Sequence, residues 1–289
     1  MLPPCRRARL RTRRINKMEK VERTKDGLLV ESGYFDPAAT LFSGQCFRVK
    51  RTEEGFEAIS GDKNCKVRTE RIGVRSKTLI ITDEPDYFCH YFDLGANYGN
   101  IVKSLSGFPE LNDDIEAGRG IHILRQQLFE TIISFIISAN NNIPRIKGII
   151  GRICERFGRQ MDGFYAFPTP FELQDVKTED YAALGAGYRA EYLESTVKVL
   201  LNSDVLTKLP QMAYADAVKT LMTLKGVGRK VADCICLFAL HHTRCYPVDT
   251  WIQKRDGLSA NEARKAAEER YGDLAGYAQQ YKYYAAIRG

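Results

Sequence analysis

The chain has 289 residues, 44% hydrophobic and 27% charged, which is the composition of a globular protein with a sizeable core. Its longest apolar run, at residues 128–139, contains polar side chains and is too short to cross a bilayer, so no transmembrane segment is expected. The formal net charge is +7, but residues 1–17 contribute seven Arg and Lys side chains and no acid. The other 36 basic residues are balanced by 36 acidic ones, so overall charge does not by itself indicate a DNA-binding face.

Residues 1–25 are expected to form a basic, disordered tail. The segment lacks the apolar stretch of a secretory signal. A DNA-contacting arm and a targeting segment are its functional alternatives, and Met18 is a second candidate for the first residue of the protein.

The eight cysteines are scattered, with no CxxC pair and no histidine at the spacing of a zinc partner. We therefore expect reduced thiols and no metal site. The protein is expected to be intracellular, in the cytoplasm or nucleoid of a bacterium or in the nucleus of a eukaryote.

Residues 26–113 predict a small domain rich in antiparallel β-strands. Short strand-like segments alternate there with polar turns, and these spacings suit hairpins rather than crossover connections. The predicted strands are 28–30, 46–49, 56–59, 65–68 and 78–81.

Residues 114–289 predict a helical region. Isoleucines at 146, 149, 150 and 153, followed by Phe157, recur with the offsets of one buried helix face. Further helices are predicted at 190–201, 212–224, 229–240, 251–256, 260–271 and 274–287. Strands followed by helices indicate an α+β fold.

The segment from Leu224 to Asp233 places the turn Gly226-Val227-Gly228 between two predicted helices. Glycines allow a tight turn, and the next helix contributes its positive dipole end, so this helix-hairpin-helix suits a DNA phosphate of any sequence. The patterns of a phosphate loop and of a dinucleotide site are not matched. On its own, such a turn is structural as often as functional.

Lys230 and Asp249 are the candidate catalytic residues. Lys230 lies in the first turn of the second hairpin helix, where the dipole favours a neutral, nucleophilic amine. Asp249 follows Pro247 and precedes the next predicted helix. From position alone, an N-cap role for Asp249 and a solvated surface role for Lys230 are the simpler alternatives.

Residues 224–232, together with Pro247-Val248-Asp249, resemble the hairpin, loop and catalytic Asp of the helix-hairpin-helix DNA glycosylase superfamily, whose bifunctional members carry a lysine at the position of Lys230. Its iron–sulfur members have four cysteines after the Asp, whereas this chain has none after Cys245. Four further segments resemble 8-oxoguanine DNA glycosylases, in family order: 40–48, 138–145, 184–190 and 276–279. The resemblance implies an N-terminal antiparallel β-sheet domain and then two helical subdomains that flank the active-site cleft.

The resemblance also implies a pocket for the lesion base, which is extruded from the duplex at the cost of unstacking. There the carbonyl of Gly44 is expected to accept the N7–H that 8-oxoguanine has and guanine lacks. Gln279 is expected to bind the Watson–Crick edge, while Cys234 and Tyr283 sandwich the ring. Tyr283 stands where the family has Phe, and core packing is the simpler role for Cys234.

On the DNA left behind, Tyr188 resembles the wedge beside the vacated base. Asn140, Arg145 and Arg189 resemble readers of the unpaired cytosine, because planar Asn and Arg side chains suit paired contacts with base edges. Trp251 departs from the family, where a His that contacts phosphate is usual.

The function implied by the resemblance is base excision repair, with removal of 8-oxoguanine opposite cytosine from double-stranded DNA. Attack of the Lys230 amine on C1′, aided by Asp249, would give a Schiff base and strand cleavage by β-elimination, so the enzyme would be both a glycosylase and a lyase. We expect a monomer with no cofactor and no membrane contact. The alternatives are a glycosylase for another damaged base and a non-catalytic DNA-binding module; the joint presence of Lys230 and Asp249 argues against the module.

Overall fold

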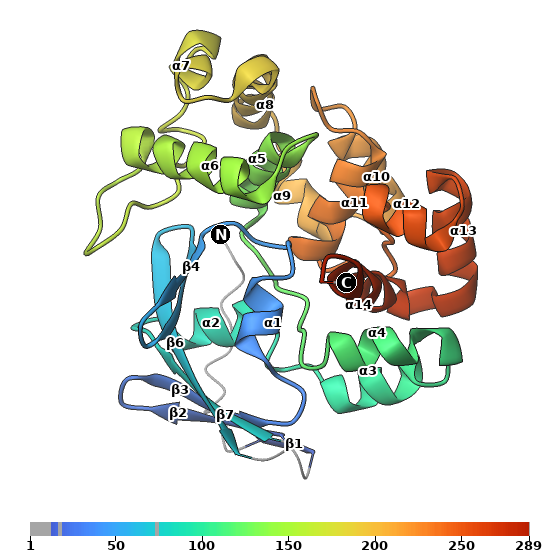
Figure 1. Cartoon of the computed structure of the whole chain (residues 1–289). Coiled ribbons are helices and arrows are strands. Elements are labelled where there is room, and N and C mark those ends of the chain that lie inside the picture. The colour runs from blue at the N-terminus through green and yellow to red at the C-terminus, as the bar shows by residue number, and fades with distance from the viewer. Residues whose placement is uncertain (1–12, 17–18, 73–74, 289) are drawn as a thin grey trace.

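The computed structural model describes residues 13–16, 19–72 and 75–288, which form a β-sheet at one end of the molecule and a larger helical body (Figure 1). Within these residues, seven strands make one antiparallel sheet in the order β1-β2-β3-β7-β6-β5-β4. The strands are β1 (Arg13–Asn16), β2 (Glu19–Thr24), β3 (Gly27–Ser32), β4 (Val49–Thr52), β5 (Gly55–Ser60), β6 (Lys63–Ile72) and β7 (Arg75–Ile81).

The helices predicted from residue 190 onward are confirmed, with small shifts at their ends, and so is the isoleucine-rich helix. The helices are α1 (Pro37–Leu41), α2 (Pro85–Tyr91), α3 (Tyr98–Leu105), α4 (Asn112–Ala117), α5 (Leu128–Ser138), α6 (Ile143–Phe157), α7 (Thr178–Ala183), α8 (Ala190–Leu201), α9 (Val205–Lys208), α10 (Tyr214–Leu221), α11 (Arg229–Phe238), α12 (Thr250–Asp256), α13 (Ala260–Tyr271) and α14 (Ala275–Ala286). Short 3₁₀ segments are η1 (Pro109–Leu111), η2 (Gly187–Arg189), η3 (Leu209–Gln211) and η4 (Gly272–Leu274). Among the described helices, none has the length and apolar character that a membrane span needs.

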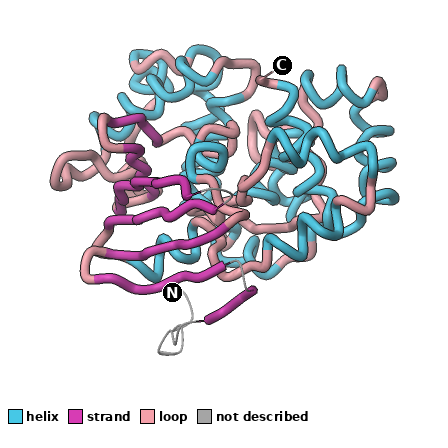
Figure 2. The backbone as a smooth tube through the Cα atoms, turned by 60° about the horizontal axis from the view of Figure 1, so that its bottom comes forward, coloured by secondary structure: helices cyan, strands magenta, loops and turns pink. Residues whose placement is uncertain are grey.

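One face of the sheet is apolar. Leu28 of β3 pairs with Ile80 of β7, which pairs in turn with Val67 of β6, and all three side chains are buried. Such a row needs a second layer to cover it. The cover comes from α1 and α2, whose Leu41 and Phe88 belong to the same buried cluster. Figure 2 shows the strands as a layer with helices beside it.

The sheet begins earlier than predicted. β2 pairs with β3 along its whole length. The prediction that residues 1–25 form a disordered tail is therefore wrong for Glu19–Thr24, while residues 1–12 lie outside the described part. The prediction of a strand at 46–49 is also wrong, because β4 starts only at Val49. The preceding backbone is held by side chains instead, as where Gln126 Nε2 donates to the Gln45 carbonyl at 2.6 Å.

The predicted domain boundary at residue 113 does not coincide with the change in packing. α3 and α4 lie beneath α14 in Figure 1, away from the sheet, and α4 contacts α14. Tyr98 of α3 packs edge-on against Tyr277 of α14, with ring centres 5.8 Å apart. The C-terminal helix is therefore fixed by segments from both halves of the chain.

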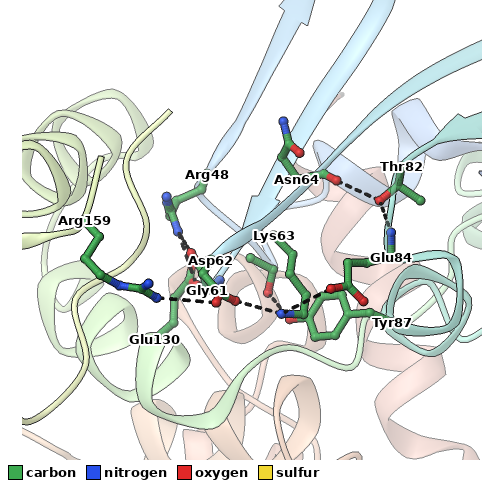
Figure 3. Close-up of polar contacts among 11 residues, drawn as sticks. Arg48, Gly61, Asp62, Lys63, Asn64, Thr82, Glu84, Tyr87, Glu130 and Arg159 are labelled. Atoms are coloured by element: carbon green, nitrogen blue, oxygen red, sulfur yellow. Dashed lines mark hydrogen bonds and ion pairs between the residues drawn. The ribbon is translucent and has the colours of Figure 1, made fainter. Parts of the chain in front are cut away.

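A polar network joins the β5–β6 turn to α5 (Figure 3). The N–H of Gly61 donates to Glu130 Oε2 at 2.6 Å, and Arg48 Nη1 donates to the Gly61 carbonyl at 3.0 Å. Arg48 and Glu130 form an ion pair at 3.5 Å, although both side chains are largely buried. Burial raises the pKa of Glu130, and the charge of Arg48 opposes this rise. Because an unpaired buried charge is costly, the pair fixes α5 against the sheet.

Candidate active site

The predicted helix-hairpin-helix is formed by α10, the glycine turn and α11. Gly226 has a φ of +82°, and a Cβ there would lie 2.3 Å from the Tyr192 ring, so the turn requires glycine. α11 begins after Gly228, and no described side chain caps it. Its first N–H groups are left for an external acceptor, as in helix termini that bind phosphate. Val227 differs from its neighbours, because its side chain is buried and its N–H donates to the Leu224 carbonyl at 3.1 Å, so the phosphate contact predicted for it lacks a free donor.

We expect Gly226→Ala to lower the free energy of unfolding by about 2 kcal/mol, because alanine is strained at this φ and its Cβ would meet Tyr192. Gly228→Ala is the matched control, since a Cβ there meets no described atom within 4 Å. Chemical denaturation of the two variants measures the difference. Equal stabilities would show that the turn tolerates a side chain at both positions.

α11 brings Lys230 to a cavity and ties down the neighbouring Arg229. Arg229 Nε donates to Asp233 Oδ1 at 3.0 Å, and its Nη2 donates to the Tyr214 hydroxyl at 2.9 Å. Asp233 is fully buried, which raises the pKa of its carboxyl against the opposing charge of Arg229. The Nζ of Lys230 lies over the ring of Phe135, 5.6 Å from its centre.

Asp249 caps α12 and also lines the cavity. Its Oδ1 accepts the main-chain N–H groups of Trp251 at 3.0 Å and Ile252 at 2.9 Å, so the N-cap role is confirmed. The same carboxylate lines the cavity together with Lys230. The cap therefore fixes the orientation of a charge beside the candidate nucleophile.

This cavity collects the residues predicted for the lesion-base pocket. Its volume is about 40 Å³, which is well below the range for small-molecule sites. The predicted residues that line it are Gly44, Lys230, Cys234, Asp249, Gln279 and Tyr283, joined by Ser43, Phe135, Phe238, Pro247 and Gln280. They come from separate parts of the chain that only the tertiary fold brings together.

Gln279 presents an unpaired acceptor at the cavity. Its side chain is 5% exposed, and its Oε1 has no hydrogen-bond partner among the described residues. A buried acceptor without a partner is costly, so its place at a cavity wall points to a donor supplied by a ligand. Cys234 lines the same cavity, and burial raises the pKa of its thiol to about 11 against the opposing charge of Lys230. The thiol is therefore uncharged at neutral pH.

Gly44 and Tyr283 meet at the cavity wall. Gly44 has a φ of +77°, and a Cβ there would lie 2.9 Å from the Tyr283 hydroxyl, so glycine permits this approach. Burial raises the pKa of Tyr283 to about 12, which keeps its hydroxyl neutral. Gln280 Nε2 donates to the Ser43 carbonyl at 2.9 Å and so ties the loop to α14.

The side chains that support the Gly44 loop, including Gln280, were not predicted from the sequence. Gln45 is fully buried, and its Nε2 donates to the carbonyls of Thr40 at 3.0 Å and His122 at 2.9 Å. Its Oε1 accepts the N–H of Leu124 at 2.8 Å. The signal available in the sequence was a glutamine directly after Gly44, within the segment 40–48 that resembles the family.

Arg189 supports the loop of Asn140 from below the surface. Its Nε donates to the Ala139 carbonyl at 2.8 Å, and its Nη2 donates to the Asn140 carbonyl at 2.7 Å. Asn140 has a φ of +49°, in the left-handed region that asparagine tolerates better than most residues. Arg189 is only 2% exposed, so its predicted contact with cytosine is not available in this arrangement, because main-chain carbonyls occupy its donors.

Tyr188 and Arg145 are exposed members of the predicted opposite-base set, as is Asn140. Tyr188 lies in η2, is 54% exposed and donates its hydroxyl to the Ala139 carbonyl at 3.3 Å. Arg145 lies in the first turn of α6, and its Nη2 donates to the Gly185 carbonyl at 3.4 Å. Both side chains are thus anchored at the surface beside the Asn140 loop.

A larger groove, with a volume of about 1000 Å³, connects these features. It shares Lys230, Asp249 and Tyr283 with the small cavity, which therefore opens into it. Gly226 and Asn140 also line the groove. The glycine hairpin, the candidate catalytic pair and the asparagine loop thus border one surface.

Within the described part of the chain, no cluster of three or more His, Cys, Asp or Glu side chains is arranged to hold a metal ion. Seven cysteines, at positions 46, 65, 89, 154, 234, 236 and 245, are free there.

Comparison with known proteins identifies the family. Residues 28–132 match the model of the 8-oxoguanine DNA glycosylase N-terminal domain, and residues 133–271 match that of the HhH-GPD superfamily of base excision DNA repair proteins. An N-glycosylase/DNA lyase of Arabidopsis thaliana is 33% identical over 290 residues, covering 86% of this chain and 76% of the relative. An N-glycosylase/DNA lyase of Saccharomyces cerevisiae is 39% identical over 165 residues, covering 50% of this chain but only 44% of the yeast protein.

Solved structures agree with this result. The 8-oxoguanine glycosylase/lyase of Clostridium acetobutylicum, in complex with double-stranded DNA containing cytosine opposite 8-oxoguanine, matches with a TM-score of 0.84 at 36% identity. The match covers 93% of this chain and 97% of that chain. Sequence, domain order and overall fold therefore lead to one conclusion: the chain belongs to the 8-oxoguanine DNA glycosylase family of the helix-hairpin-helix DNA glycosylase superfamily.

Proposed function

We propose that this protein removes 8-oxoguanine opposite cytosine from double-stranded DNA, with Lys230 as the nucleophile and Asp249 as its electrostatic partner. Family membership makes the protein a base-excision-repair glycosylase with DNA lyase activity. The observation that carries the finer proposal is the convergence of Lys230, Asp249 and the unpaired oxygen of Gln279 on one cavity.

Recognition in this proposal depends on two acceptors. The Gly44 carbonyl accepts N7–H of the extruded base, whereas guanine presents a lone pair at N7 and would repel that carbonyl. Gln279 Oε1, which lacks a partner in the described chain, accepts an N–H from the Watson–Crick edge. Cys234 and Tyr283 supply the flanking surfaces for the ring, and the neutral thiol of Cys234 avoids a second buried charge.

Catalysis then uses the side chains at the cavity. The amine of Lys230 forms a bond to C1′ and gives up a proton, while the bond from C1′ to the base breaks and the base leaves with the electron pair and takes up a proton. Asp249 stabilises the positive charge that develops on the sugar. Ring opening gives a Schiff base between Lys230 and C1′, and loss of a C2′ proton expels the 3′ phosphate. Water then releases the amine.

The proposal needs duplex DNA as the partner, and it needs no metal or organic cofactor, because every step above uses a side chain or water. A single copy of the chain is sufficient, since one chain supplies both the catalytic pair and the opposite-base loop. The protein would work inside the cell, in the compartment that holds the DNA.

Borohydride trapping on a duplex with 8-oxoguanine opposite cytosine tests the function. A covalent protein–DNA adduct is expected, and oxidised-pyrimidine duplexes should compete weakly. A glycosylase for another base would give a stronger adduct with a competing lesion, whereas a DNA-binding module would give tight binding and no adduct.

Excision should prefer 8-oxoguanine opposite cytosine over adenine by at least about tenfold, equivalent to ~1.4 kcal/mol. Arg145 offers donors to the acceptors of cytosine, whereas the amino group of adenine would leave a guanidinium donor unpaired. Single-turnover rates on duplexes that differ only in the opposite base measure the preference. Equal rates opposite all four bases would contradict it.

Two arginine variants separate base reading from loop support. Arg145→Ala should reduce the preference for cytosine over adenine as the opposite base. Arg189→Ala should instead slow excision opposite both cytosine and adenine, because Arg189 holds the Asn140 backbone. Arg152→Ala is the control, since Arg152 also lies on α6 but donates to the Leu184 carbonyl. A preference lost equally in all three variants would mean that none of these arginines reads the base.

A further inference from the structure

Trp251 is an exposed aromatic residue on the wall of the groove. It is the only tryptophan of the chain, and it is 50% exposed. It lines the groove together with Lys230 and Asp249. The reaction steps described above give it no role, although a large apolar ring left in water at such a position is unfavourable.

Two of the helix N-termini at this groove, those of α11 and α12, differ in what they offer to DNA. α11 starts at Gly228 without a side-chain cap among the described residues, so its N–H groups suit a phosphate. At α12, Asp249 already accepts the N–H groups of Trp251 and Ile252 and places a negative charge there. Thr250 and the two residues after it carry no positive charge. The α12 end of the groove is therefore poorly suited to phosphate.

We propose that the indole of Trp251 packs flat on a nucleotide next to the extruded lesion, on the lesion strand. This inference rests on the proposed function, because Asp249 lies at the sugar that is attacked and Trp251 is only two residues away. Aromatic stacking accepts any base, since every base has a flat face, and it suits a wall that lacks phosphate donors. The contact adds affinity without adding sequence preference.

The main-chain N–H of Trp251 also links this contact to the reaction centre. Since that N–H donates to Asp249 Oδ1 at 3.0 Å, a nucleotide packed on the indole bears on the segment that orients the carboxylate. The contact then helps to place the lesion sugar as well as to hold the DNA.

Fluorescence gives a direct readout, because the chain has a single tryptophan. The measurement uses the Lys230→Gln protein, so that binding is not followed by reaction, and titrates it with a duplex containing 8-oxoguanine opposite cytosine. We expect emission to be quenched on binding. Quenching should be weaker with the matching undamaged duplex, in which no nucleotide is extruded.

Affinity measurements in the same background identify the kind of contact. Trp251→Ala should weaken lesion-duplex binding about tenfold, with an unchanged dependence of binding on salt, because no ionic contact is lost. Trp251→Phe should stay within about twofold, since phenylalanine stacks but has no ring N–H. Phe171→Ala is the control, because Phe171 is 69% exposed but does not line the groove, and it should bind like the parent.

Two results would overturn the inference. Unchanged emission, with Trp251→Ala binding like the parent, would mean that the ring does not touch DNA. Equal losses in Trp251→Phe and Trp251→Ala would mean that the indole N–H binds an acceptor instead of stacking. Either result can occur while the protein with Lys230 intact still forms the borohydride adduct, so failure here is distinct from failure of the proposed function.

Discussion

Replacing Lys230 with glutamine is expected to abolish borohydride trapping and to lower the single-turnover excision rate by at least about 10³-fold. Glutamine is polar and of similar bulk, but its amide nitrogen is not a nucleophile. Lesion binding should persist, because the cavity walls and the glycine hairpin keep their own supports, such as the Gln280 contact to Ser43. Trapping gels and a binding titration on the same duplex measure the two effects.

Lys225→Gln is the matched control for this change. Lys225 precedes the same glycine turn, is partly exposed and pairs with Glu191 at the surface, outside the cavity. This variant should still form the covalent adduct. Full strand cleavage by Lys230→Gln would assign the nucleophile to another residue.

The sequence predicted the helical half of the fold better than the sheet. Long amphipathic helices repeat their apolar face many times, so α6 and the helices from α8 onward carried a strong signal. β2 did not, because Val21 is the only large apolar residue of Glu19–Thr24 and the other side chains are mostly charged, as is common near sheet edges. Cys46 and Phe47 are apolar and buried, but they lie in a loop. They therefore resemble strand residues in the sequence although they pair with no neighbouring strand.

The site was predicted as a set of residue types rather than as an arrangement. The glycine turn, Lys230 and Asp249 belong to one recognisable motif, so the sequence was enough to name them as candidates. The sequence could not show that the Arg189 guanidinium donates to the main-chain carbonyls of Ala139 and Asn140, because those contacts join segments about 50 residues apart. For the same reason, the support that Gln280 gives to the loop of Gly44 emerged only from the fold.

Replacing Asp249 with asparagine is expected to lower the single-turnover rate by roughly 10²-fold or more, about 2.7 kcal/mol, because the negative charge beside the developing positive sugar is lost. The side-chain oxygen of asparagine can still accept the N–H groups of Trp251 and Ile252, so the cap of α12 should survive. Thermal unfolding of the variant should therefore resemble that of the parent. A lower excision rate would then be due to the loss of the negative charge of Asp249.

Asp249→Ala separates the two roles of this carboxylate, since alanine removes both the charge and the cap. Loss of an N-cap costs about 1 kcal/mol, so Asp249→Ala should be less stable than Asp249→Asn by about that amount while its excision rate is similarly low. Paired denaturation curves and single-turnover rates test both statements. If Asp249→Asn excised at the parental rate and only Asp249→Ala were impaired, the contribution of Asp249 would lie in capping α12, and the charge that stabilises the sugar would have to come from elsewhere in the cavity.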